Sequence, residues 1–345
     1  MALFPVRRPT VGLHIGPRAL TLVEVGREWR HAGRGWRLRQ CLKRDLPGGV
    51  LQVSPTEPNI ANLTILTDQL RTMLDGVRSN CVALSLPDQC ARVALFDFET
   101  LPNKPAEIEA LLRFRFQKDL AVPLGDARIA YRVFRTKIEG ASVVRVLVAA
   151  VRQEIVGQYE QWCEQAGGIP VAIGLSSFLL FDACTAAMTT SARDALFLHV
   201  TEHGLTFLAF QQGVPVFLRV KSLPVPPADV PGTDDPQTAP VIQELVATLH
   251  YYADRHLGRS GETESRQCPL YLVKAYGEYQ MGRRVPDLKD PLSEAACEVL
   301  SKTLSDQLQV RLMTLDWNVL RVSSGSTNGP LSRSGLPAIA AMLAA

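Results

Sequence analysis

Few residues of the chain have the types and spacing that chemistry needs, and the most suggestive are His199 and His203, with Glu202 between them. Histidines four positions apart bind a metal ion when they share one face of a helix. These two lie instead in an apolar stretch, residues 195–220, whose turns predict strand, turn and strand. Their side chains then point in different directions, so we expect turn or core histidines and no metal site.

Other catalytic patterns are missing from the sequence. It has no Gly-x-Gly-x-x-Gly or Walker loop, and the stretch 174–178, Gly-Leu-Ser-Ser-Phe, lacks the last glycine of a nucleophile elbow. Asp97 and Glu99 share one face of an expected strand, as a pair of catalytic carboxylates would, but solvated charges are the simpler interpretation. We therefore expect no catalytic residues of these classes.

Two stretches of similar design organise the elements around these residues. Residues 11–25 read as an apolar strand, a Gly-Pro turn and a second apolar strand, and residues 195–220 repeat this design. Such a repeat predicts two related halves that face each other. A cleft between halves is a common place for a ligand.

Between and after these hairpins the apolar periodicity predicts alternating helices and strands, which indicates an α/β protein. Helices are expected at residues 59–74, 105–120, 154–166, 177–188 and 241–257, with a short helical tail at 338–345. Strands are expected at residues 80–86, 92–98, 127–137, 143–151, 170–175, 268–273 and 310–315.

Length and composition indicate an ordinary globular protein of more than one domain. The chain has 345 residues, of which 46% are apolar and 21% charged, and its net charge of +3 does not require a nucleic-acid partner. It contains no apolar run long enough to span a bilayer and no secretion signal at its start. Its seven cysteines form no Cys-x-x-Cys pair, which favours reduced thiols and the cytoplasm.

Residues 26–44 are the most basic stretch, with seven arginines and lysines. One interpretation is a patch for nucleic acid or anionic lipid. The simpler interpretation is a twisted strand with a solvated basic face, which we prefer because no aromatic stacking motif accompanies the charges.

An ordered set of short motifs resembles the PilM family, the actin-like inner-membrane assembly proteins of type IV pili. The cytoplasmic actin-like part of the type II secretion platform is a related family. The motifs are Gly-Leu-His-Ile-Gly at 12–16, Leu-Pro-Asp at 86–88, Leu-Pro at 101–102, Glu-Ile-Glu-Ala-Leu-Leu-Arg-Phe at 107–114, Val-Pro-Leu at 122–124 and Val-Ala-Ala-Val-Arg-Gln-Glu at 148–154. The resemblance is strongest over residues 11–180 and weakest after residue 268.

The resemblance implies an actin-like (ribonuclease H-like) α/β fold of two halves, with a small α+β subdomain inserted in the first. Residues 1–89 and 168–193 would form the first half, 90–167 the inserted subdomain, and 194–345 the second half. The expected localisation is cytoplasmic and peripheral at the inner membrane, where the basic leader and residues 27–44 would face anionic lipid.

The resemblance also identifies a degenerate nucleotide site. In the family an Asp in each hairpin anchors hydrated Mg²⁺, and turn amides and a Lys hold phosphate. The corresponding residues here are His14, Gly16, Arg18 and Thr21 in the first hairpin and His199 and Gly204 in the second. The Gly-Gly pair expected for adenosine is replaced by Lys-Ala-Tyr-Gly at 274–277. Because Mg²⁺ prefers oxygen ligands, the loss of both acids argues against hydrolysis. We expect no cofactor; ATP with Mg²⁺ is the alternative.

The expected function is therefore that of a scaffold. By resemblance, the partner is the cytoplasmic N-terminal peptide of a bitopic membrane protein, PilN. The groove would be walled by the strand at 92–98 and the helix at 108–116. The candidate contact residues are Phe96, Arg113, Phe114, Arg115 and Lys118. Self-association through the inserted subdomain is a further expectation. The alternatives are an ATP-binding or ATP-hydrolysing actin-like protein and a component of a type II secretion platform.

Overall fold

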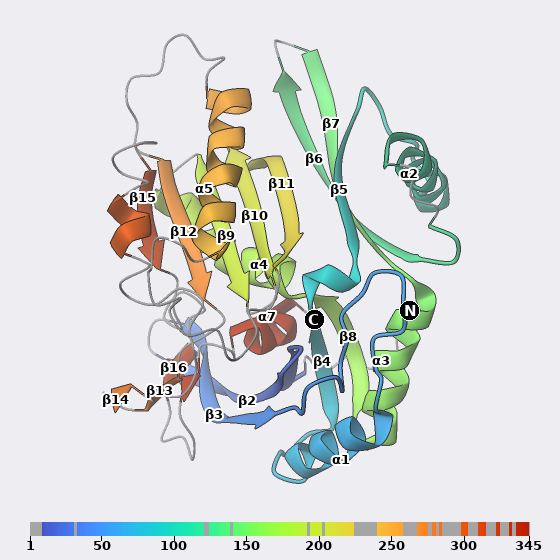
Figure 1. Cartoon of the computed structure of the whole chain (residues 1–345), viewed down its shortest axis with the longest axis vertical. Coiled ribbons are helices and arrows are strands. Elements are labelled where there is room, and N and C mark those ends of the chain that lie inside the picture. The colour runs from blue at the N-terminus through green and yellow to red at the C-terminus, as the bar shows by residue number, and fades with distance from the viewer. Residues whose placement is uncertain are drawn as a thin grey trace.

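The computed structural model describes most of the first half of the chain and selected elements of the rest (Figure 1). The described residues are 9–30, 33–120, 124–138, 141–191, 194–201, 204–223, 240–257, 268–274, 278–280, 283–284, 298–302, 310–314, 322–324, 331–332 and 336–344.

The first half is built on a sheet of six described strands. Their order is β16 (Val322–Ser324), β3 (Gly33–Asp45), β2 (Ala19–Arg30), β1 (Val11–Ile15), β4 (Cys81–Leu86) and β8 (Ile169–Leu175). β1, β2 and β3 form an antiparallel meander, whereas β4 and β8 run parallel to β1. Every residue of β1 is buried because helices cover both faces of the sheet.

The second half repeats this topology with five described strands. Their order is β11 (Val214–Ser222), β10 (Gly204–Gln211), β9 (Ala195–Thr201), β12 (Cys268–Lys274) and β15 (Val310–Thr314). The first three are again antiparallel, and β12 and β15 again run parallel to the central strand. The internal repeat expected from the two hairpins is confirmed.

The helices fit the alternation of side chains along the strands. In β2, Leu20 and Leu22 join a core with α1 (Leu63–Leu74) and α3 (Gln153–Gln165), whereas Val23 and Val25 join a core with α4 (Ser176–Ser191) and α7 (Leu336–Ala344). The second core also contains side chains of β9 and β10, so it connects the two halves. α5 (Pro240–Tyr252), continued by η2 (Ala253–Leu257), packs on the second sheet. β14 (Arg283–Arg284), β13 (Glu278–Gln280) and β17 (Leu331–Ser332) form a further small sheet.

The inserted unit projects beside the second half (Figure 1). It follows η1 (Asp88–Cys90) and contains β5 (Arg92–Phe98), α2 (Pro105–Leu120), β6 (Arg128–Ile138) and β7 (Ala141–Val151). The sheet order is β5, β7, β6, and all pairs are antiparallel. α2 places Leu112 and Phe116 on one face of this sheet, against Phe96 and Val146.

Two parts of the predicted domain division need correction. The prediction placed residues 153–165 in the inserted subdomain, yet α3 buries Ile155, Tyr159 and Trp162 in the core of the first half. It also placed all residues after 194 in the second half. β16 instead pairs with β3, and α7 packs on β1, β4 and α4, because its almost wholly apolar sequence needs a covered face.

The basic stretch forms β2 and β3, as its simpler interpretation predicted. Of its described side chains, Arg39 pairs with the buried Glu24 at 3.2 Å, and Lys43 lies 3.7 Å from Asp45. The basic leader, residues 1–8, lies outside the described residues. None of the helices in the described part of the chain is long and apolar enough to cross a membrane.

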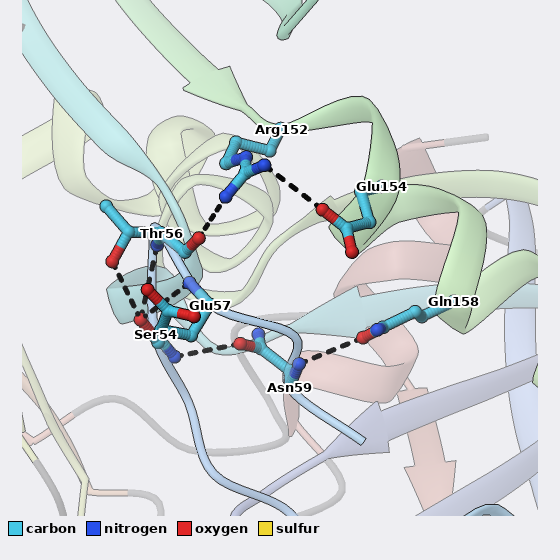
Figure 2. A network of polar contacts seen from close by, with 7 residues as sticks. All are labelled: Ser54, Thr56, Glu57, Asn59, Arg152, Glu154 and Gln158. Carbon is cyan, nitrogen blue, oxygen red and sulfur yellow. Dashed lines mark hydrogen bonds and ion pairs between the residues drawn. The ribbon is translucent and has the colours of Figure 1, made fainter. Parts of the chain in front are cut away.

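The loop between β3 and α1 is fastened to the start of α3, where the chain returns from the inserted unit (Figure 2). The Gln158 side-chain oxygen accepts hydrogen bonds from the backbone N–H groups of Asn59 (2.9 Å) and Ile60 (3.4 Å). Arg152 donates to the Thr56 carbonyl. This joint therefore fastens the loop to the start of α3, within the first half, at the point where the chain leaves the inserted unit.

The joint gives a first prediction. Gln158→Leu removes the acceptor of two backbone N–H groups, so we expect it to lower the free energy of unfolding by about 1–2 kcal/mol. The measurement is denaturant unfolding, with Gln161→Leu as the control, because Gln161 is exposed on the same helix. Equal stability of the two variants would contradict the prediction.

Candidate functional site

The two hairpins place one histidine each in the central strand of its sheet. His14 of β1 lies between Thr21 of β2 and Ser85 of β4, and His199 of β9 lies beside Thr206 of β10. Both histidines are buried, and His199 has no exposed surface. The structure therefore brings together the two positions that the resemblance assigned to metal-anchoring acids.

His14 is held by two serines at the ends of parallel strands. Its Nδ1 lies 3.4 Å from Ser85 Oγ and 3.3 Å from Ser176 Oγ. Ser176 donates its proton to the Leu86 carbonyl at 2.7 Å, so Ser85 must donate in the 2.9 Å contact between the two hydroxyls. Both hydroxyl protons are then used, and the neutral His14 ring must carry its proton on Nδ1.

His199 is held in the same way by a third serine. Its Nδ1 lies 2.7 Å from Ser177 Oγ, and Ser177 donates its own proton to Asp88. The His199 proton must therefore also be on Nδ1, which leaves Nε2 as a bare acceptor. That atom is buried and has no hydrogen-bond partner among the described residues.

Asp88 is the buried carboxylate of this network. It accepts hydrogen bonds from the Ser177 backbone N–H at 3.0 Å, from the Ser177 hydroxyl and from Thr206 Oγ1 at 2.6 Å. Burial raises the pKa of Asp88, and the hydrogen bonds from Ser177 and Thr206 oppose that rise. The three donors compensate a charge that the apolar surroundings disfavour.

Burial also sets the charge of both imidazoles. It lowers the pKa of His14 to about 3, with the nearby His199 as a second cause, and lowers the pKa of His199 to about 3. Both rings are therefore neutral at physiological pH. No group of three or more possible metal ligands occurs among the residues that the structure describes.

The other predicted nucleotide residues lie in the turns. The Gly16 N–H donates to the Ala19 carbonyl at 2.9 Å, within the first turn. Arg18 is exposed there, and its carbonyl accepts from the Leu46 N–H. Thr21, at the family's Lys position, is buried in β2. The first turn, residues 16–19, thus contains no acidic side chain, and it uses the Gly16 amide internally.

Gly204 opens β10, where the second hairpin meets the first half. A Cβ at this position would lie 2.2 Å from Gln89 Nε2 and 2.4 Å from the Lys221 carbonyl oxygen. The glycine therefore permits close packing of protein on protein. Residues 202–203 and 275–277, which carry Glu202, His203 and most of the substituted adenosine motif, lie outside the described residues.

Sequence reasoning missed most of this network: Ser85, Asp88, Ser176, Ser177 and Thr206. The available signal was position. Ser176 and Ser177 directly follow β8, and Asp88 follows β4, at the carboxyl ends of parallel strands where α/β folds gather functional groups. Asp88 belongs to the Leu-Pro-Asp motif at residues 86–88, which indicated the family resemblance but no role in a site.

The predicted partner-binding residues divide into two groups. Phe96 is buried against Phe116, with ring centroids 5.3 Å apart, so its prediction as a surface contact is wrong. Arg115 lies over the Phe96 ring at 5.0 Å, and Arg113 bonds Glu109 and two backbone carbonyls. The contacts of Phe96, Arg113 and Arg115 therefore lie within the inserted unit and stabilise its packing.

The second group faces solvent on α2. Phe114 is 57% exposed, and Lys118 Nζ lies 5.8 Å from the centre of its ring. A large aromatic ring with this exposure on a well-packed helix is a candidate anchor for a partner. Of the five predicted contacts, Phe114 and Lys118 therefore remain candidates.

Comparisons with known proteins identify the fold. No protein-family model and no curated protein matches the chain. Among solved structures, PilM of the PilM–PilN type IV pilus biogenesis complex aligns over 98% of both chains, with a TM-score of 0.68 and 18% sequence identity.

The cytoplasmic domain of EpsL, an inner-membrane component of the type II secretion system of Vibrio cholerae, covers 90% of this chain and 92% of its own, with a TM-score of 0.44 and 11% identity. A Bacteroides thetaiotaomicron protein with an actin-like ATPase fold and unknown function covers 89% and 91%, with a TM-score of 0.44 and 12% identity. The predicted actin-like α/β fold is confirmed.

Proposed function

We propose that this chain, which has the fold of PilM, is a scaffold protein of a type IV pilus assembly platform. In this proposal it lies at the cytoplasmic side of the inner membrane, binds the N-terminal peptide of a bitopic membrane partner and does not hydrolyse ATP. The observation that carries the proposal is the pair of buried, neutral histidines, His14 and His199, at the two positions where the family anchors Mg²⁺.

The chemistry of the network supports the absence of hydrolysis. Mg²⁺ demands oxygen ligands in octahedral geometry, and a neutral imidazole supplies a nitrogen. The Nδ1 atoms of both histidines are already directed at serine hydroxyls. Asp88, the carboxylate of the network, accepts three hydrogen bonds from protein groups. An ion at this place would therefore have to compete with the protein's own donors for the Asp88 oxygens.

The construction of the inserted unit supports peptide binding. Arg113 and Arg115 fix α2 to its own sheet and loop, which makes a firm platform. Phe114 and Lys118 project from it as an aromatic anchor beside a positive charge. The solved structure with the same fold is a complex of PilM with PilN, and by analogy we assign this chain a PilN-like partner.

Hydrolysis is tested by calorimetric titration of the full chain with ATP and Mg²⁺, followed by a phosphate-release assay. We expect no binding heat and no phosphate release. Phosphate release that disappears in the Gly16→Val variant would contradict the proposal, because it would show that the first hairpin still holds a phosphate.

Peptide binding is tested with the cytoplasmic N-terminal peptide of a PilN-like protein from the same genome. We expect Phe114→Ala to weaken binding by at least about tenfold, because buried aromatic anchors contribute about 2 kcal/mol or more. Tyr251→Ala is the control, since Tyr251 is an exposed aromatic residue on α5 in the other half. Equal affinities of the two variants would place the peptide away from α2.

A further inference from the structure

The Asp88 carboxylate is shared between the two halves of the molecule. Asp88 belongs to η1, which follows β4 of the first half, and Ser177 lies in the first turn of α4. Thr206, whose hydroxyl donates to Asp88 Oδ2 at 2.6 Å, lies in β10 of the second half. All three side chains are buried, with exposures of 4%, 0% and 1% respectively. One anion therefore accepts hydrogen bonds from both sides of the boundary.

Two further contacts join the two halves close to Asp88. His199 of β9 donates to Ser177 at 2.7 Å, which is a second polar link across the boundary. Gly204 packs so closely on Gln89 that a side chain there would collide with it. The boundary at this point is thus filled by side chains of the chain itself.

An apolar layer continues the boundary beside the network. Phe181 of α4 stacks on Phe210 of β10, with ring centroids 4.2 Å apart, and meets Phe197 of β9 edge-on. Apolar contacts do not fix direction, whereas hydrogen bonds to one carboxylate do. The network can therefore determine the angle at which the two halves meet.

We propose that Asp88 is a built-in anionic ligand, which closes the two halves on each other without any bound small molecule. A tethered carboxylate loses no translational freedom when it bridges the halves, unlike a ligand from solution. Separation of the halves would break the hydrogen bond from Thr206 to Asp88, whereas the two hydrogen bonds from Ser177 lie within the first half and would remain. This inference goes beyond the proposed function, because it concerns the closure of the fold whether or not a peptide binds.

The test is hydrogen exchange of the full chain carrying Thr206→Val, which keeps the shape of the side chain and removes one hydroxyl. A hydrogen bond to a charged group is worth enough to change an opening equilibrium by about 10- to 100-fold. We expect amides of η1, the start of α4 and β10 to exchange faster by that factor. Amides of α1 and α2 should be unchanged.

Thr248→Val is the matched control. Thr248 is fully buried in α5 of the second half, and its hydroxyl has no hydrogen-bond partner among the described residues. The same substitution there removes a hydroxyl without breaking a bridge, so we expect no faster exchange at the boundary. Equal exchange at the boundary in the two variants would overturn the proposal.

A second variant tests the role of the anion. In Asp88→Ala we expect the same boundary amides to lose protection, and sodium formate to restore protection better than sodium chloride at equal concentration. A boundary that stays protected in Asp88→Ala, or that responds equally to the two salts, would overturn the proposal. These readouts are independent of ATP hydrolysis and peptide affinity, so failure here is distinguishable from failure of the proposed function.

Discussion

Acidification from pH 7 to pH 5 is expected to destabilise the protein through two buried histidines, whose combined contribution to stability falls by roughly 4 kcal/mol. His14 and His199 have folded-state pKa values of about 3, whereas an unfolded histidine titrates near 6.5. Between these values the unfolded chain binds two more protons than the folded chain. The contribution of the two histidines is therefore complete about one pH unit above 6.5 and falls as the pH drops, by up to about 2.7 kcal/mol per pH unit.

Asp88 acts in the opposite direction over part of this range. Because its pKa is raised by burial, the folded state takes up a proton more readily than the unfolded state. Protonation of Asp88 on acidification therefore favours the folded state and offsets part of the loss. Two histidines outweigh one carboxylate, so the net slope keeps the sign set by the histidines.

Denaturant unfolding at a series of pH values between 8 and 5 measures this effect. His14→Asn and His199→Asn each remove one titrating group, so each should halve the histidine contribution to the slope even if it lowers stability at pH 7. His250→Asn is the control, since His250 is exposed on α5 and should leave the slope unchanged. A flat profile in the unmodified protein would show that the imidazoles are not buried and neutral.

Gly12→Ala is expected to cost about 3 kcal/mol and to displace α7. A Cβ on Gly12 would lie 1.9 Å from the Ala338 carbonyl oxygen and 2.6 Å from its carbonyl carbon. These are backbone atoms of a helix, so they cannot move without the helix, and overpacking of this kind reaches the upper end of its usual cost. Displacement of α7 would also uncover Ile339 and Met342, which are buried.

Thermal unfolding and hydrogen exchange of residues 336–344 measure this prediction. Gly157→Ala is the control, because Gly157 lies inside α3 and a Cβ there meets no atom within 4 Å. That variant should be neutral or slightly stabilising, since alanine favours a helix more than glycine does. Full protection of α7 in Gly12→Ala would mean that the helix does not sit against β1 as described.

Local patterns in the sequence were sufficient to predict most of the regular elements. The stripe of Ile108, Leu112 and Phe116, opened by Pro105, predicted α2 with its observed bounds. The similarity of the two hairpins predicted the repeated sheet topology. These features depend on neighbours along the chain, and periodicity reports such neighbours directly.

Features that depend on distant partners were not predictable in this way. The apolar tail at residues 338–345 has the pattern of a helix, but the pattern does not say which half it covers. Phe96 lies on a strand of mixed character, and only the position of Phe116 shows that its face is the buried one. The histidine positions followed from resemblance, whereas the role of Asp88 depends on Ser177 and Thr206, which lie 89 and 118 residues away.

The packing of α7 on β1 has a consequence for folding during synthesis on the ribosome. Gly12 emerges early, but its cover at Ala338 is made 326 residues later. At about 5–20 residues per second, roughly 16–65 seconds pass between the synthesis of Gly12 and that of Ala338, and the apolar face of β1 lacks its cover during this time. The first half therefore remains incomplete on the ribosome until Ala338 has been synthesised, and we expect it to bind chaperones that shield exposed sheets during this interval.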